Sequence, residues 1–351
     1  MNTGFPVANR ELAFNVAPAS FVVRGVVVMR FTRRNFFYFA SVTCGAALFG
    51  GGYAAGSYRA TLTTAHARIT QKSSLIRTRF GDLEYAIEGH GDPFIMVHGT
   101  GGGFDQGLRF SGGLISSGFK VIAPSRFGYL RSSFPNDPSP QNQADCLVEL
   151  MDFLKIDQVP IAGGSAGALT AAYFALRHPS RCSHLVLIVP AMNLTHQDPV
   201  EFTRFQRFLV GHLLSSDRWF WCAQAFAPEQ LIGTLLATDP ALLGTVDASE
   251  RERAYLILNE LMPISRRSQG IANDGRTSGT PSDIDFSKIK TPTLIVSAED
   301  DRFGTARSAH IIKGRLPSAR LVMFPTGGHI WLGREHELVS EIRDFVPGLA
   351  G

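Results

Sequence analysis

The pentapeptide Gly163-Gly164-Ser165-Ala166-Gly167 constrains the fold of this chain more than any other stretch of its sequence. It follows a short apolar run, residues 159–162, and precedes an apolar stretch, residues 168–176, whose composition favours a helix. A serine between a strand and a helix sits on a sharp turn, and glycine is needed at both flanks because a Cβ there would collide with neighbouring backbone. The pattern therefore predicts a strand–turn–helix unit that exposes Ser165 at the end of a buried strand.

Short apolar runs alternate with helical patterns over most of the chain after residue 73. The runs expected to form buried strands are residues 94–97, 120–124, 159–162, 185–189, 293–296 and 320–324. Two more strands, residues 74–80 and 83–88, are expected to flank a hairpin turn at Gly81-Asp82. Helical spacing marks residues 141–154, 306–316 and 336–346. This alternation predicts an α/β fold with a doubly wound, mostly parallel sheet.

The alternation stops between residues 192 and 285, where large apolar side chains repeat at helical spacing. They include Phe202, Phe205, Phe208, Leu209, Leu213 and the Trp219-Phe220-Trp221 cluster. We expect a helical cap inserted after the sixth strand, above the carboxyl ends of the strands, where ligands bind in such sheets. Residues 265–282 are polar and rich in Gly and Ser, which predicts a loop back to the sheet.

The N-terminal region has the pattern of an export signal. Thr32-Arg33-Arg34-Asn35-Phe36-Phe37 opens an uncharged stretch over residues 36–56, and Met29 lies just ahead of it as an alternative start. Paired arginines before a Phe are typical of the twin-arginine type, which predicts export to the periplasm or secretion. The alternative is a retained anchor over residues 36–56, which are enough to span a bilayer.

The expected division of the chain follows from these patterns. A signal or anchor segment with a disordered N-terminus takes residues 1–59. The two parts of the α/β core take residues 60–191 and 286–351, and the cap takes residues 192–285. At 351 residues, 44 % of them hydrophobic, the chain is long enough to bury a large core.

Composition and spacing exclude several classes of protein. The formal net charge is only +4, and no basic stripe interleaved with aromatics indicates a nucleic-acid surface. No metal-ligand spacing occurs, so we expect no metal and no cofactor, and contact with a membrane only through the N-terminal segment. Cys44, Cys146, Cys182 and Cys222 are scattered, which favours free thiols, while a disulfide among the last three stays open.

Ser165 needs a neighbouring base, and that base needs an orienting carboxylate, before the hydroxyl becomes a good nucleophile. Loops after two later strands supply both groups. Residues 297–305 contain the adjacent pair Asp300 and Asp301, and residues 325–332 contain His329. We expect Asp301 to orient His329, with Asp198, after the strand at residues 185–189, as an alternative acid.

A glycine-rich loop, His98-Gly99-Thr100-Gly101-Gly102-Gly103, follows the strand at residues 94–97. Such a loop leaves backbone N–H groups free to face a developing oxyanion. We expect the amides of Thr100 and Ala166 to be the two donors, and Gly99, Gly163 and Gly167 to give the backbone the room that it needs. His98 is expected to hold the loop rather than act as a base.

Together these motifs resemble an α/β-hydrolase-fold serine hydrolase of the carboxylesterase-like kind with a helical cap. The resemblance covers residues 74–347 and lies in His98-Gly99, Gly163-x-Ser165-x-Gly167, Ala298-x-x-Asp301 and Gly328-His329. The chain departs from the family at residues 125–132, where an Asp before G-x-G-x-S is usual and Ser125-Arg126 stands instead, and at Ala298, where glycine is usual. The first departure is expected to reshape the pocket wall.

The resemblance implies hydrolysis of small carboxylic esters through an acyl-enzyme. Two alternatives use the same residues: carbon–carbon bond hydrolysis in aromatic degradation, and a proline-iminopeptidase-like activity, for which Glu201 and Glu229 are the acidic residues noted in the cap. A dinucleotide-binding turn is disfavoured because Ser165 occupies the second glycine position of G-x-G-x-x-G. A non-catalytic receptor on the same fold is a further alternative, but such receptors generally lack a triad member.

The export signal gives a first testable prediction. Replacing Arg33 and Arg34 by Lys keeps the charge but should retain the protein in the cytoplasm, because a receptor reads the arginine pair as an address. Cell fractionation measures the distribution. Normal amounts of the double-Lys variant in the periplasm would instead favour another export route or an anchor.

Overall fold

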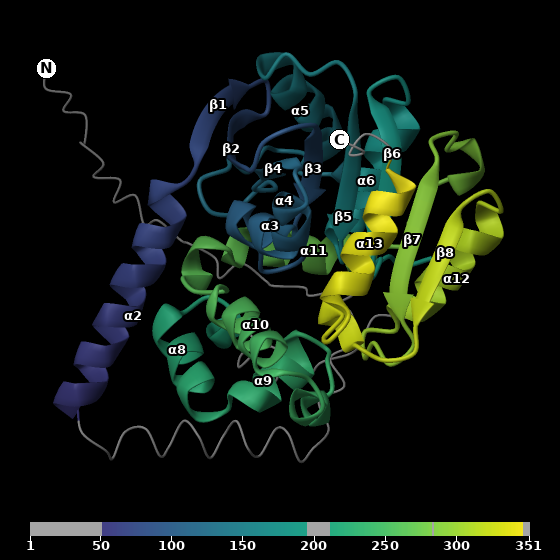
Figure 1. Ribbon diagram of the computed structural model, residues 1–351. Coiled ribbons are helices and arrows are strands. Elements are labelled where there is room, and N and C mark those ends of the chain that lie inside the picture. The colour runs from purple at the N-terminus through teal and green to yellow at the C-terminus, as the bar shows by residue number, and fades with distance from the viewer. Residues whose placement is uncertain (1–50, 195–210, 283, 347–351) are drawn as a thin grey trace, which may run out of the picture.

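An eight-stranded sheet forms the centre of the molecule in the computed structural model, which describes residues 51–194, 211–282 and 284–346 (Figure 1). The strands are β1 (Ser74–Thr78), β2 (Gly81–Glu88), β3 (Pro93–Val97), β4 (Lys120–Pro124), β5 (Val159–Gly164), β6 (Cys182–Ile188), β7 (Thr293–Ala298) and β8 (Arg320–Phe324). Their spatial order is β1-β2-β4-β3-β5-β6-β7-β8. Pairs involving β2 are antiparallel, and every pair from β4 to β8 is parallel. The mostly parallel sheet is therefore confirmed.

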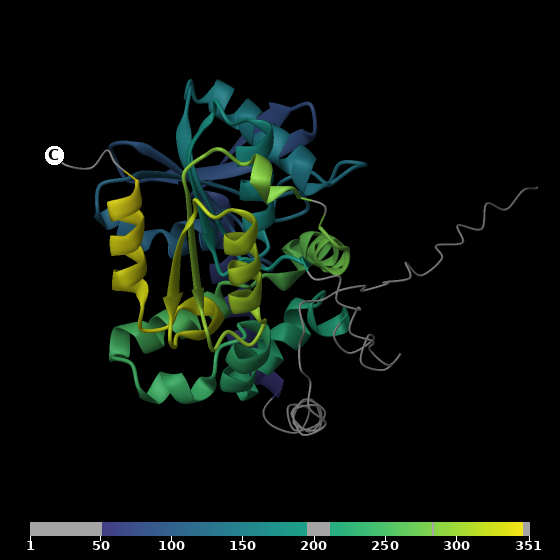
Figure 2. The same ribbon diagram turned by 90° about the vertical axis from the view of Figure 1, so that its right-hand side faces the viewer.

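Helices cover both faces of the sheet (Figure 2). One face carries α3 (Phe104–Phe110), α4 (Gly112–Ser116) and α13 (Glu335–Phe345), and the other carries α5 (Pro140–Phe153), α6 (Gly167–Arg177) and α12 (Thr305–Arg315). The central strands are apolar throughout because both of their faces are covered. In β3, Phe94 and Met96 pack into the core under α3 and α4, while Ile95 and Val97 pack into the core under α5 and α6.

The hairpin lies close to its expected position, but its turn is earlier. Arg79 and Phe80 form the turn, and Gly81 already belongs to β2, where it pairs with Thr78. Gly81 has a φ of 103°, and a Cβ there would lie 2.6 Å from the Cβ of Ser133. Glycine is therefore needed at the first residue of the strand rather than in the turn.

A long N-terminal helix, α2 (Gly51–Gln71), precedes the sheet, and the boundary expected between residues 59 and 60 falls inside it. Ala65 and Ile69 are buried in the core, and Arg68 donates to the carbonyl of Glu260 at 2.9 Å. Tyr58 contacts Trp221 edge-on at 5.7 Å. The arginine pair and most of the apolar segment of the expected signal lie outside the described residues. Within those residues, no helix is long and apolar enough to cross a membrane.

The insertion between β6 and β7 is helical and lies over one end of the sheet (Figure 1). Its described elements are α8 (Asp217–Phe226), α9 (Pro228–Leu235), η1 (Pro240–Gly244), α10 (Ala248–Asn259), η2 (Ile264–Arg266) and α11 (Ser268–Gly279). A short η3 (Phe286–Lys288) follows just before β7. Of the cap aromatics, Phe220 is fully buried, whereas Trp219 is 45 % exposed. Phe202, Phe205, Phe208 and Leu209 lie outside the described residues, as do Asp198 and Glu201.

The loop expected over residues 265–282 is wrong, because helix α11 occupies most of this range. Its small residues have a packing reason. A Cβ at Gly270 would lie 2.2 Å from the ring of Tyr129, and the amide of Gly270 donates to the carbonyl of Gly128 at 3.0 Å. Glycine thus lets α11 pack directly on the loop after β4.

The described cysteines, Cys146, Cys182 and Cys222, are free thiols, so no disulfide joins them. Burial raises the pKa of the Cys146 and Cys182 thiols to about 12. Such thiols stay protonated at neutral pH and behave as small apolar side chains.

Candidate active site

Ser165 stands on a tight turn between β5 and α6, with a φ of 52°. Its amide donates to the carbonyl of Ile188 at 2.9 Å. A Cβ on Gly163 would lie 2.4 Å from the carbonyl oxygen of Gly167, and one on Gly167 would lie 2.4 Å from that of His98. The turn therefore requires both glycines, and the strained φ of Ser165 is held by the strand and helix on either side.

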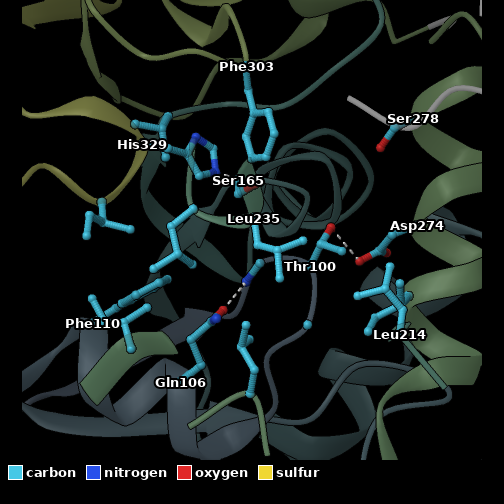
Figure 3. A pocket seen from close by; sticks show the side chains of 18 of the residues that line it. Thr100, Gln106, Phe110, Ser165, Leu214, Leu235, Asp274, Ser278, Phe303 and His329 are labelled. Carbon is cyan, nitrogen blue, oxygen red and sulfur yellow. Dashed lines mark hydrogen bonds between the residues drawn. The ribbon is translucent and has the colours of Figure 1, made fainter. Parts of the chain in front are cut away.

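His329 and Asp301 complete a continuous chain of hydrogen bonds to Ser165. Figure 3 shows the imidazole of His329 beside Ser165. The Nε2 atom of His329 lies 2.8 Å from the Oγ atom of Ser165, and its Nδ1 atom lies 2.8 Å from Oδ2 of Asp301. All three side chains are buried. When Nδ1–H donates to the carboxylate, Nε2 is free to accept the serine proton, which is the arrangement that activates a hydroxyl nucleophile.

The adjacent carboxylates of Asp300 and Asp301 have different partners. Oδ1 of Asp301 also accepts the amide of Phe303 at 2.8 Å, and Oδ2 accepts the hydroxyl of Thr305. Asp300 instead accepts the amides of Gly327 at 3.2 Å and Gly328 at 2.8 Å. Asp301 therefore orients the imidazole, while Asp300 holds the loop that carries it.

Two contacts of this group were not expected from the sequence. Thr305, at the start of α12, bonds to Asp301 and also lies 3.0 Å from the hydroxyl of Ser297. The ring of Phe303 stands edge-on to the imidazole of His329 at 4.7 Å. The one sequence signal for Phe303 and Thr305 was that both follow β7 closely, near the expected acid Asp301.

The glycine-rich loop after β3 passes directly beside Ser165. A Cβ on Gly99 would lie 3.0 Å from the Cβ of Ser165. The amides of Gly99 and Gly101 are occupied, by Gln106 Oε1 at 2.9 Å and by the hydroxyl of Tyr129 at 3.3 Å. The amides of Thr100 and Ala166 make no hydrogen bond to any of the described residues. These two donors are therefore free to bind an oxygen atom.

His98 is a structural residue of this loop. Its Nδ1 lies 2.7 Å from the carbonyl oxygen of Gly99, and its Nε2 accepts the amide of Arg126 at 2.9 Å. Complete burial, together with the charge of Arg126, holds the pKa of His98 well below its usual value. The ring is therefore neutral, with its proton on Nδ1.

The departure at residues 125–132 creates a buried ion pair beside the site. Arg126 binds both carboxylate oxygens of Asp274 in α11, at 2.6 and 2.7 Å. Burial opposes the charge on Arg126, but Asp274 outweighs it and raises the Arg126 pKa. Asp274 was missed by the sequence reasoning because its segment was expected to be a loop.

A cavity of about 120 Å³ opens onto Ser165, between the sheet edge and the cap (Figure 3). Its apolar lining comes from both parts of the molecule and includes Phe110, Leu214, Leu235, Ile257, Ile271 and Trp331. Its polar lining includes Thr100, Gln106, Ser165, Asp274, Ser278 and His329. No lysine or arginine is among the described residues that line it. Nor do His, Cys, Asp and Glu residues in the described ranges form a cluster that could hold a metal ion.

The comparisons with known proteins agree with this geometry. The protein-family model described as alpha/beta hydrolase fold matches residues 92–219 of this chain. The chain is 31 % identical over 287 residues to a 2-hydroxy-6-oxononadienedioate/2-hydroxy-6-oxononatrienedioate hydrolase of Paraburkholderia xenovorans, covering 78 % of this chain and 95 % of that one. The chain belongs to the α/β-hydrolase fold family.

This α/β hydrolase also resembles proteins whose names give no substrate. It is 27 % identical over 274 residues to the uncharacterized hydrolase YcgS of Bacillus subtilis, covering 73 % of this chain and 91 % of that one. A solved α/β hydrolase fold protein from Nakamurella multipartita has a TM-score of 0.63 and 22 % identity, covering 78 % and 98 % of the two chains. The comparisons identify this α/β hydrolase as an enzyme and leave its substrate open.

The two adjacent carboxylates of the α/β hydrolase give a second prediction. We expect Asp301→Asn to lower kcat about 10³- to 10⁴-fold, because an amide facing Nδ1 favours the wrong tautomer of His329. Asp300→Asn should cost far less, because its amide oxygen still accepts one of the two glycine N–H groups and Asp300 does not contact His329. Turnover is measured for both variants, with circular dichroism to check folding. The reverse ranking would move the orienting role to Asp300.

Proposed function

We propose that this enzyme hydrolyses small neutral carboxylic esters through an acyl-enzyme formed on Ser165. The observation that carries the proposal is the chain of two 2.8 Å hydrogen bonds from Ser165 through His329 to Asp301, at the mouth of an apolar cavity. A buried serine hydroxyl paired with an oriented imidazole is suited to acyl transfer.

In the first half of the reaction, the Oγ atom of Ser165 attacks the ester carbonyl while Nε2 of His329 takes its proton. Asp301 stabilises the imidazolium that forms. The amides of Thr100 and Ala166 bind the oxyanion, helped by the positive end of α6 next to Ser165. His329 then protonates the departing alcohol, which leaves Ser165 as an ester of the acid.

In the second half, water attacks the carbonyl of the acyl-enzyme and gives its proton to His329. The second tetrahedral intermediate uses the same two amides. Its collapse returns the proton to Ser165 and releases the carboxylic acid. The net reaction consumes one ester and one water and needs no cofactor.

The cavity supports a small and uncharged substrate. Its volume of about 120 Å³ is below that of an engineered cavity of about 150 Å³ that holds benzene, so it suits a short acyl chain. Its described lining is mostly aliphatic and aromatic, and its titratable members are His329 and Asp274. Among the described lining residues, a carboxylate on the substrate would meet the Asp274 carboxylate and no free cation, which disfavours anionic substrates.

Carbon–carbon bond hydrolysis is the second candidate, favoured by the relative from Paraburkholderia xenovorans. That relative's name gives a dienedioate, a dicarboxylate, as its substrate. Arg126 and Arg267, two buried arginines near the cavity, are paired with Asp274 and Asp105. The described residues that line the cavity thus include no free arginine or lysine for a dicarboxylate, and we rank this reaction second.

A proline-iminopeptidase-like activity has less support. It requires a carboxylate in the cap that holds the substrate amine. Asp274 is an acidic cap residue in the cavity wall, but Arg126 already binds both of its oxygens. Glu229 is exposed and is not part of the cavity lining.

The third prediction separates these reactions with one panel of substrates. Full-length enzyme and Ser165→Ala are assayed on p-nitrophenyl esters from acetate to octanoate, on 2-hydroxy-6-oxo-6-phenylhexa-2,4-dienoate and on an aminoacyl naphthylamide. We expect turnover of the short esters, lost by at least about 10³-fold in Ser165→Ala. If the dienoate is cleaved in a Ser165-dependent way and the esters are not, the second candidate is favoured. If no substrate is turned over, the proposal is overturned.

A further inference from the structure

A single buried carboxylate collects four hydrogen bonds beside the proposed oxyanion site. Oδ1 of Asp274 accepts Nη1 of Arg126 at 2.6 Å. Oδ2 accepts Nη2 of Arg126 at 2.7 Å, the hydroxyl of Tyr129 at 2.5 Å and the hydroxyl of Thr100 at 2.9 Å. Figure 3 shows Asp274 reaching from α11 toward Thr100. With both oxygens filled in this way, Asp274 has no role as a base.

Asp274 and its partners bind the first four residues of the glycine-rich loop. Arg126 donates from Nε to the carbonyl of His98 and from Nη2 to the carbonyl of Gly99, each at 3.0 Å. The hydroxyl of Tyr129 accepts the amide of Gly101 at 3.3 Å. Thr100 is bound directly through its own hydroxyl. Four consecutive loop residues therefore depend on Arg126, Tyr129 and Asp274.

The network is buried, and its arginine and tyrosine stay protonated. Arg126 is 7 % exposed, Asp274 is 4 % exposed, and Tyr129 is fully buried. Burial, reinforced by the Asp274 charge, raises the pKa of Tyr129 well above its usual value, so its hydroxyl stays protonated and can donate. Charge-assisted hydrogen bonds are stronger and more directional than neutral ones, particularly in such surroundings.

The loop needs this support because four of its six residues are glycine. Glycine loses more conformational freedom on ordering than any other residue, so a loop of this composition does not hold one geometry by itself. An oxyanion donor stabilises a transition state only when it is already aimed at the developing charge. The amide of Thr100 therefore needs an external support, and the hydroxyl of the same residue is bound to Asp274.

We propose that Asp274 and Arg126 are positioning residues that hold the Thr100 amide in place for the oxyanion. The inference rests on the proposed function, because it assigns a role in the same acyl transfer. Asp274 belongs to the cap and Arg126 to the loop after β4. The packing of the cap on the core thus completes the oxyanion site, as well as covering the cavity.

The fourth prediction uses variants that separate positioning from stability. Thr100→Val removes only the hydroxyl, keeping the amide and the Arg126–Asp274 pair. Asp274→Asn weakens the whole network and leaves Arg126 with a neutral partner. The matched control is Thr234→Val, which removes another buried threonine hydroxyl of the cap, bound at 2.7 Å to the carbonyl of Gln230. Thr234 is not itself part of the cavity lining, although Leu235 and Leu236 beside it are.

We expect kcat for the preferred ester to fall about 10-fold in Thr100→Val and about 100-fold in Asp274→Asn, with KM changed little. A misplaced N–H donor weakens binding of the transition state more than binding of the substrate. The double variant should also lose about 100-fold rather than 1,000-fold, since both changes break one linkage. Thr234→Val should keep the wild-type kcat, with a melting temperature lowered as much as in Thr100→Val.

Three results would overturn the positioning role. They are a wild-type kcat in folded Thr100→Val, a loss confined to KM, and losses that multiply in the double variant. If Asp274→Asn does not fold, the comparison of kcat between Thr100→Val and Thr234→Val decides alone. If the wild-type enzyme turns over no ester, the proposed function is wrong and the positioning role with it. If the wild type is active and the variants keep its kcat, only the positioning role is wrong.

Discussion

The close approach of backbone at the end of β5 is the constraint on which the rest of the site depends. Gly167 lies against the carbonyls of Val97 and His98, so the start of α6 touches the end of β3 with no side chain between them. This contact places Ser165 beside the glycine-rich loop and forces its left-handed φ of 52°. A methyl group at Gly167 would push the start of α6 away from Val97 and His98, and one at Gly163 would push it away from β5.

The parallel sheet brings the other groups to the same place. The loops after β3, β5, β7 and β8 all leave from the carboxyl edge, so residues far apart in sequence meet there. The cap is then tied down by two buried ion pairs, Arg126 with Asp274 and Arg267 with Asp105. Buried pairs add little net stability after desolvation, but they fix orientation. The role of these two pairs is therefore to place the cap and the glycine-rich loop.

The sequence predicted best what depends on short-range pattern. The strands at residues 120–124 and 320–324 match their observed bounds, because continuous apolar runs mark strands covered on both faces. Helix α11 was missed, since its glycines are a loop signal in the sequence, whereas Gly270 is needed for close packing against the ring of Tyr129. Asp274 was missed with it. Its role depends on a contact with Arg126, 148 residues away in sequence, and no local pattern carries that information.

The central claim is that Ser165 is an activated nucleophile. The most direct measurement is covalent labelling of the full-length enzyme with a fluorophosphonate probe, followed by mass spectrometry of the digested protein, because an activated serine beside two free amides attacks phosphorus as it does an acyl carbon. The account predicts one adduct, on the peptide that contains Ser165, and its disappearance in Ser165→Ala. Labelling that persists undiminished in Ser165→Ala would contradict it.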